Sequence, residues 1–293
     1  MEFLQPRSLR DALAVKADRP EAVPIAGGTD VMVELNFDRR RPEAVLDLGR
    51  VEELAAWDRQ DGRLRVGAGI TYTRAIAELA GDLPGLAIAA RTVGSPQIRN
   101  RGTVGGNLGS ASPAGDCHPP LLAVGAEVEV ASAAGSRRIP IDEFFTGPKQ
   151  SALAPDELIC AVHLPPAAGP QQFAKIGTRN AMVIAVCSFA LALDPGRGRV
   201  GTGIGSAGPT PLRASDAESF LQGVLGSEGL WASRAPLGDA AAARFGELVA
   251  GAARPIDDVR GSAAYRKHAL SVLARRTLTW AWDEHRTGER ACA

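Results

Sequence analysis

Residues 165–170 read Pro-Pro-Ala-Ala-Gly-Pro, and this segment restricts the fold more than any other part of the chain. Each proline lacks a backbone N–H and fixes φ, so neither a helix interior nor a central strand can pass through it. We therefore predict a domain boundary here. The expected first domain covers residues 1–168, and the second covers residues 169–293.

Short helices and strands alternate in the expected first domain. Ser8 is suited to cap a helix, and Asp61-Gly62 favours a tight turn between paired strands. Apolar periodicity predicts helices over residues 9–17, 72–80 and 83–93, and strands over residues 23–26, 63–66, 126–130, 138–141 and 158–164. This mixture indicates an α+β fold.

The last third of the chain has a different composition. Residues 183–193 and 200–206 are apolar and flank the turn Pro195-Gly196, so they predict an antiparallel pair of strands. Three later segments, residues 215–223, 239–252 and 262–286, are rich in alanine, leucine, arginine and glutamate, which favour helices. We expect a small sheet covered by helices.

Charge and hydropathy argue against two classes of partner. The chain has 33 basic and 33 acidic residues, so no excess positive charge is available to follow a phosphate backbone. No run reaches the roughly 18 apolar residues that a membrane span needs, and the opening residues lack the pattern of a secretory signal. We expect a cytoplasmic protein that binds neither nucleic acid nor membrane.

The residues that most often bind metals in proteins are scattered. The chain contains four cysteines and four histidines: Cys117, Cys160, Cys187, Cys292, His118, His163, His268 and His285. None of them form the close pairs that zinc or iron–sulfur sites require. We predict no metal site, and buried or incidental thiols.

Two glycine clusters carry the strongest chemical signal. The first, Ala26-Gly27-Gly28-Thr29-Asp30, directly follows an apolar strand, and the second, residues 101–109, again pairs glycines with a hydroxyl and an amide. Glycine pairs let backbone N–H groups converge on a phosphate, and Asp116 can accept hydrogen bonds from sugar hydroxyls. Taken alone, the first cluster fits an ordinary turn equally well. Two such clusters in one domain indicate a dinucleotide.

A third glycine pair, Gly67-Ala68-Gly69, begins like the fingerprint of a Rossmann fold. Its sixth position is Tyr72 instead of glycine, and no acidic residue clearly ends a second strand about 20 residues later. A Rossmann site is therefore poorly supported.

Several segments together closely resemble the flavoprotein subunit of the xanthine dehydrogenase and carbon monoxide dehydrogenase family. They are residues 26–30, 96–108, 111–116, 156–159, 173–175 and 258–266. They occur in the order and at the separations of that family, and they extend over nearly the whole chain. The resemblance implies a PCMH-type FAD-binding domain of two α+β subdomains, about residues 1–55 and 56–168. A C-terminal α+β domain with an antiparallel sheet covered by helices would follow it.

The resemblance also implies which residues bind FAD. The diphosphate would be held by two groups, namely Ala26, Gly27, Gly28, Thr29 and Asp30 from one side, and Thr103, Gly105, Gly106 and Asn107 from the other. Asp116 would bind the ribityl or ribose region, and Ile159 and Lys175 would lie near the isoalloxazine ring. The flavin carries the redox chemistry, so no catalytic residue and no metal ligand are expected in this chain.

In this family the flavoprotein works with a large molybdopterin subunit and a small subunit that holds two [2Fe–2S] clusters, and we expect a dimer of heterotrimers. Electrons would reach FAD from the nearer cluster and leave as hydride to NAD⁺, or pass to another acceptor. Some relatives carry a cysteine-rich insertion for a [4Fe–4S] cluster between the positions of Asn107 and Asp116; this chain lacks it, so FAD is the only expected cofactor. Residues 26–35 and the C-terminal helix resemble purine-oxidising xanthine dehydrogenases more than carbon monoxide enzymes. The resemblance therefore implies xanthine or another purine as the substrate of the complex, with carbon monoxide or an aldehyde as the alternative.

Two alternatives stay open from the sequence. A self-contained flavin oxidoreductase of the PCMH fold would need its own acid–base groups and often a covalent flavin link, and no such constellation is evident. A scaffold that keeps the fold without FAD would not need the intact glycine clusters.

Overall fold

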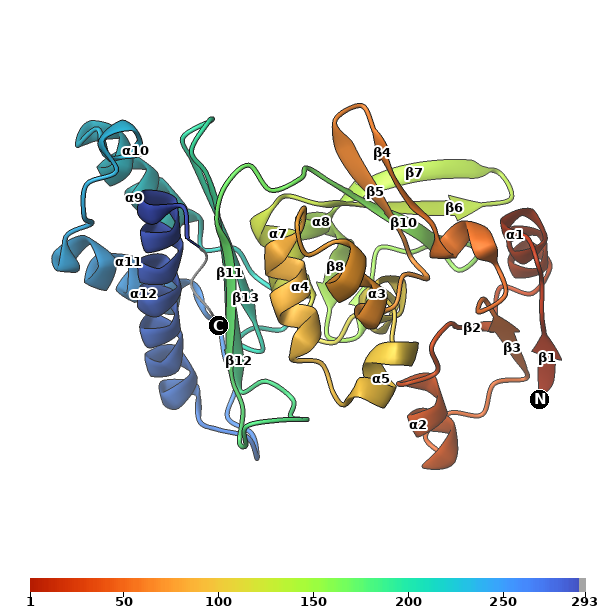
Figure 1. Cartoon of the computed structure of the whole chain (residues 1–293). Helices are drawn as coiled ribbons and strands as arrows, with labels where there is room; N and C mark the ends of the chain where they lie inside the picture. Colours follow the sequence, from red (N-terminus) through yellow and green to blue (C-terminus); the bar gives the residue numbers. More distant parts are fainter. Residues whose placement is uncertain (290–293) are drawn as a thin grey trace.

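The computed structural model describes residues 1–289 and shows three units in a row (Figure 1). The N-terminal unit contains a three-stranded parallel sheet in the order β1–β3–β2. Its elements are β1 (Glu2–Leu4), α1 (Leu9–Asp18), β2 (Val23–Ile25), α2 (Val31–Asn36) and β3 (Ala44–Asp47). The Ser8 hydroxyl accepts a hydrogen bond from the Asp11 N–H at 3.1 Å, which confirms the predicted helix cap.

The middle unit contains a five-stranded antiparallel sheet in the order β4–β5–β10–β6–β7. Its strands are β4 (Trp57–Gln60), β5 (Arg63–Gly67), β6 (Glu127–Ser132), β7 (Gly135–Pro140) and β10 (Leu158–Leu164), with a small hairpin of β8 (Phe145–Gly147) and β9 (Gln150–Ser151). A 3-10 turn, Glu52–Ala55, leads into β4. The predicted hairpin is confirmed, because Asp61 and Gly62 both have the positive φ of a tight turn, 50° and 74°.

Six short helices accompany this sheet: α3 (Tyr72–Glu78), α4 (Pro84–Arg91), α5 (Pro96–Arg101), α6 (Val104–Ser110), α7 (His118–Ala123) and α8 (Ile141–Phe144). Two of them, α5 and α6, lie where the sequence predicted only a glycine-rich segment. Ser95 and Thr103 cap these helices by accepting hydrogen bonds from the N–H groups of Ile98 and Gly106. The caps and the packing of α6 against β10 outweigh the low helix propensity of glycine.

The C-terminal unit has an antiparallel sheet in the order β11–β12–β13. Its elements are β11 (Gln171–Ile176), β12 (Cys187–Asp194), β13 (Arg199–Gly205), α9 (Ser215–Ser227), α10 (Leu230–Ser233), α11 (Asp239–Ala252) and α12 (Ala263–Thr287). The predicted antiparallel pair is confirmed, although residues 183–186 lie in the loop before β12. Helices α9 and α12 contact one side of the sheet, α11 packs on both helices, and α4 and α7 lie against the opposite side (Figure 1).

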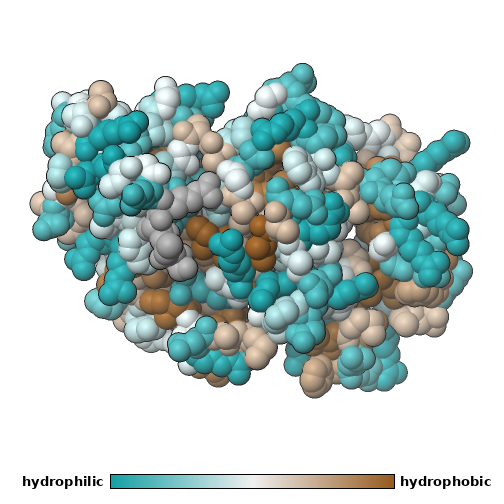
Figure 2. Space-filling view, in the orientation of Figure 1, coloured by the Kyte–Doolittle hydropathy of each residue, from teal (hydrophilic) through white to brown (hydrophobic). Residues whose placement is uncertain are grey.

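Close backbone packing joins the C-terminal sheet to the middle unit. A Cβ atom at Gly201 would lie 1.9 Å from the Ala123 carbonyl oxygen, and one at Gly203 would lie 2.0 Å from that of Pro119. These glycines of β13 therefore let α7 rest directly on the strand. In Figure 2, apolar side chains are visible between polar ones where this sheet meets α4.

Two separate hydrophobic cores lie on either side of this junction. One extends over residues 12–164 and so joins the N-terminal and middle units, and the other extends over residues 187–282. Residues 165–170 belong to no helix or strand. Within residues 1–289, no helix has the length and hydropathy that a membrane span requires.

Candidate functional site

The first glycine cluster connects the end of β2 to the start of α2. Gly28 has a φ of 76°, which favours glycine, and Gly27 is packed so tightly that a Cβ atom there would lie 1.9 Å from the Arg101 carbonyl oxygen. This contact places the first cluster against Arg101, the first residue of the second cluster. Among residues 1–289, the N–H groups of residues 27–30 have no hydrogen-bond acceptor. Four adjacent backbone donors thus remain for a ligand.

The second glycine cluster forms the first turns of α6. The N–H of Gly105 donates to the Ala68 carbonyl at 2.8 Å, and the N–H of Gly106 donates to the Thr103 hydroxyl oxygen at 2.9 Å. These donors are used within the protein, and a Cβ atom at Gly105 would lie 2.4 Å from that of Ala68. The cluster can offer a ligand the hydroxyl hydrogen of Thr103, the exposed backbone of Gly106 and the carboxamide of Asn107.

Ile159, on β10, lies next to this second cluster. Its Cδ1 atom is 3.6 Å from the point where a Cβ atom at Gly109 would be, and its side chain is buried. The structure therefore brings Ile159 together with α6.

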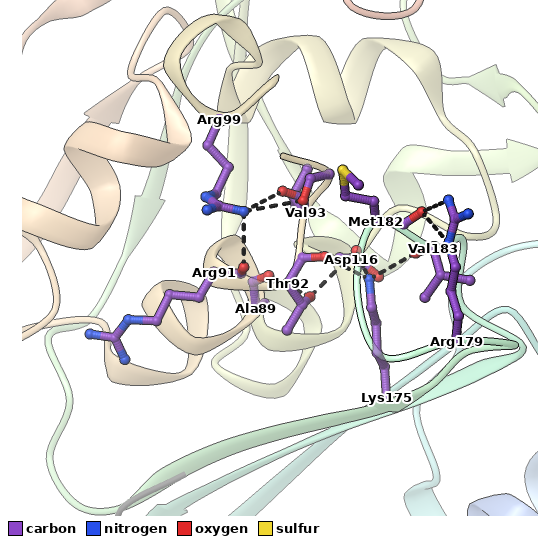
Figure 3. Close-up of polar contacts among 11 residues, drawn as sticks. Ala89, Arg91, Thr92, Val93, Arg99, Asp116, Lys175, Arg179, Met182 and Val183 are labelled. Atoms are coloured by element: carbon purple, nitrogen blue, oxygen red, sulfur yellow. Dashed lines mark hydrogen bonds and ion pairs between the residues drawn. The ribbon is translucent and has the colours of Figure 1, made fainter. Parts of the chain in front are cut away.

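Asp116 and Lys175 form an ion pair between the middle and C-terminal units (Figure 3). The Lys175 ammonium donates to Asp116 Oδ2 at 2.6 Å and to the carbonyl oxygens of Thr92 and Val183 at 2.9 and 3.1 Å. Both side chains are about nine-tenths buried, with 10% and 9% exposed. Burial raises the pKa of Asp116 to about 6, and the neighbouring Lys175 opposes that shift.

Buried polar atoms without hydrogen-bond partners gather near this pair. Within the described chain there are five such side-chain atoms: Asn107 Oδ1, Asp116 Oδ1, His118 Nδ1, Ser206 Oγ and Arg63 Nε. Three of them lie in residues 107–118, and the N–H of Ser206 donates to the Pro113 carbonyl at 2.9 Å, so Ser206 touches the same segment. Buried polar atoms are costly to leave unsatisfied, so this grouping fits a polar ligand such as FAD.

His118 is a residue of this region that sequence reasoning did not assign to the site. It is fully buried at the start of α7, and its Nε2 lies 3.0 Å from the Asn107 carbonyl oxygen. Burial lowers the pKa of His118 to about 4. Its closeness to the glycine cluster depends on the fold of residues 107–118, so no spacing pattern in the sequence indicated it.

Three of the four cysteines lie within the described residues. Cys117, Cys160 and Cys187 are free and buried, and Cys292 lies outside the described residues. No group of three potential metal ligands occurs in residues 1–289. Two surface hollows lie away from both glycine clusters: one borders β12 and β13 near Pro165, and the other lies between α11 and α12.

Comparison with known proteins identifies matches over nearly the whole chain. Residues 1–167 match the family described as FAD binding domain in molybdopterin dehydrogenase, and residues 172–281 match the CO dehydrogenase flavoprotein C-terminal domain. Among curated proteins, the putative xanthine dehydrogenase FAD-binding subunit of Escherichia coli (strain K12) is 33% identical over 93% of this chain and 92% of its own length. The nicotine 6-hydroxylase medium subunit of Paenarthrobacter nicotinovorans is 30% identical over 95% and 96%.

Solved structures give the same result for the fold. The carbon monoxide dehydrogenase of Hydrogenophaga pseudoflava contains a chain that superposes with a TM-score of 0.87 at 26% identity, covering 97% of each chain. The likeness includes the arrangement of the units, since it extends over both family segments.

Proposed function

The chain belongs to the FAD-binding subunits of the molybdenum hydroxylases, and from this membership we propose that it passes electrons from the [2Fe–2S] clusters of a partner subunit, through FAD, to NAD⁺. It is an oxidoreductase subunit with FAD as its cofactor. The observation that carries the proposal is the contact of Gly27 with Arg101, which sets the two glycine clusters side by side.

We assign the FAD-binding residues as follows. One side of the diphosphate site would be formed by Ala26 and by the free N–H groups of residues 27–30. The other side would be lined by Thr103, Gly105, Gly106 and Asn107. Gly105 acts here by close packing, because its N–H already donates to Ala68. The unpartnered Oδ1 of Asp116 would accept a hydrogen bond from a sugar or ribityl hydroxyl.

Bound FAD supplies the redox chemistry of the subunit. The protein positions the flavin and sets the electrostatic potential around it. The buried ammonium of Lys175 favours negative charge on a neighbouring group, and its three hydrogen-bond acceptors fix the position of that ammonium. Ile159 supplies an apolar surface beside α6 that excludes water. The proposed role requires no protein acid or base.

Partner subunits follow from the same membership. We propose a large molybdopterin subunit and a small [2Fe–2S] subunit, assembled as a dimer of heterotrimers in the cytoplasm. The names of the relatives, an FAD-binding subunit and a medium subunit, support a multi-subunit enzyme. The division into residues 1–168 and 169–293 is part of this proposal.

For the organic substrate we propose xanthine or a related purine, transformed in the large subunit. The Escherichia coli relative supports this choice, and the nicotine 6-hydroxylase relative, at nearly the same identity, supports another nitrogen heterocycle as the alternative.

The visible spectrum of the purified chain during anaerobic titration with NADH tests the electron route. We expect flavin bands that bleach as NADH is added and return when NAD⁺ is supplied in excess. Bands that dithionite bleaches but NADH leaves unchanged would exclude NAD⁺ as the acceptor. Oxidation of a small organic substrate by the chain alone would instead favour a self-contained oxidoreductase.

A further inference from the structure

We propose that Arg99 is a positioning residue for the flavin site: it holds the turn of residues 91–94, and that turn fixes the ammonium of Lys175. This inference rests on the proposed function, in which Lys175 lies beside the flavin. Arg99 belongs to α5, and its side-chain hydrogen bonds go to this turn and not to either glycine cluster.

A single nitrogen of Arg99 organises the turn. Its Nη1 donates to the carbonyl oxygens of Arg91, Val93 and Gly94 at 3.3, 3.0 and 3.2 Å (Figure 3). Gly94 has a φ of 46°, and a Cβ atom there would lie 2.8 Å from the side chain of Ile98, so the turn also packs closely on α5. Three carbonyl oxygens that converge on one nitrogen would repel one another if no cation were there.

The turn reaches Lys175 through one residue. The Thr92 carbonyl accepts from Lys175 Nζ at 2.9 Å, while the Thr92 hydroxyl donates to the Ala89 carbonyl at 2.7 Å and lies 3.5 Å from Asp116 Oδ2. Lys175 has three acceptors, namely Asp116, Thr92 and Val183, which match the three hydrogens of its ammonium. Displacing Thr92 therefore removes one of the three hydrogen bonds of the Lys175 ammonium and lets this positive charge move.

A double-mutant cycle tests the coupling in the full chain loaded with FAD. The variants are Arg99→Met, Lys175→Met and the double variant, with Arg99→Lys as the conservative change and Arg91→Met as the matched control. Arg91 lies in the same turn, but its side chain is exposed and has no hydrogen-bond partner among residues 1–289. The readouts are the midpoint potential of the flavin, the dissociation constant of FAD and thermal unfolding.

We expect Arg99→Met to lower the flavin potential by a shift equivalent to about tenfold in the two-electron equilibrium, roughly 30 mV. The double variant should match Lys175→Met, because Arg99 acts through that lysine. Arg99→Lys should keep the wild-type potential, since an ammonium can satisfy the same three carbonyls, and Arg91→Met should behave as wild type.

Shifts in the flavin potential that add up in the double variant would overturn the inference. A potential that Lys175→Met changes and Arg99→Met leaves unchanged would overturn it too. The proposed function would survive both results. If Lys175→Met leaves the potential unchanged, the position of Lys175 in the proposed function fails and the inference fails with it. Destabilisation of Arg99→Met that Arg99→Lys does not relieve would show a merely structural role.

Discussion

At Gly27 the absence of a side chain lets the backbone of residues 101–102 approach the first glycine cluster. A Cβ atom would lie 1.9 Å from the Arg101 carbonyl oxygen and 2.9 Å from the Gly102 nitrogen, and backbone atoms cannot move aside cheaply. We therefore expect Gly27→Ala to lower the free energy of unfolding by about 2 kcal/mol and to weaken FAD binding at least tenfold. Urea unfolding and FAD titration measure both effects.

Gly81→Ala is the matched control, because a Cβ atom there meets no atom within 4 Å. That variant should bind FAD as the wild type does. Equal affinity for FAD in Gly27→Ala and the wild type would contradict the idea that the approach of the two clusters forms the site.

Asp116 gives the site a pH dependence. The pKa of Asp116 in the folded protein, about 6, lies above the ordinary value of 3.8. Asp116 therefore adds to the free energy of unfolding below pH 3.8, where it is protonated, and this contribution is lost as the pH rises through 6. Relative to Asp116→Asn, the free energy of unfolding of the FAD-free wild type should fall between pH 4 and 6.5 by an amount on the order of 2 kcal/mol.

Denaturant unfolding across that pH range measures the difference. His118, whose pKa burial lowers to about 4, acts in the opposite direction, but it is common to both proteins and cancels. A difference that stays constant with pH would show that Asp116 keeps an ordinary pKa.

Among the elements, the contact of α7 with β13 holds the C-terminal sheet to the middle unit. A Cβ atom at Gly203 would lie 2.0 Å from the Pro119 carbonyl oxygen. We expect Gly203→Ala to separate the two hydrophobic cores, so that calorimetry shows two unfolding transitions where the wild type shows one. A single transition at the wild-type temperature in Gly203→Ala would contradict this role of the contact.

Gly223→Ala on α9, where a Cβ atom meets open space, should raise the free energy of unfolding by about 0.5–1 kcal/mol.

Element prediction from the sequence succeeded where a local signal was present. Helix α11 matches the predicted residues 239–252, and α1 begins where the Ser8 hydroxyl caps it. Helix α6 was missed because its glycines disfavour helix locally, and its packing against β10 depends on residues brought together by the fold. Helix α5 contains no glycine; its Ser95 cap, followed by Pro96, is a local signal that the prediction did not use.

At the scale of the whole molecule, the candidate site depends on contacts that sequence patterns do not contain. The glycine clusters were recognisable as motifs, and Asp116 and Lys175 were assigned separate roles by resemblance. Their ion pair joins positions 59 residues apart across two units, and the unpartnered Oγ of Ser206, the residue after β13, comes to the same region. Only the packing of the C-terminal sheet on α4 and α7 brings these groups together.

A crystal structure of the chain with bound FAD would show whether the two glycine clusters hold the diphosphate. We expect the diphosphate to lie between the N–H groups of residues 27–30 and the segment 103–107, with a ligand hydroxyl hydrogen-bonded to Oδ1 of Asp116. A diphosphate bound elsewhere, with the N–H groups of residues 27–30 facing solvent, would contradict it.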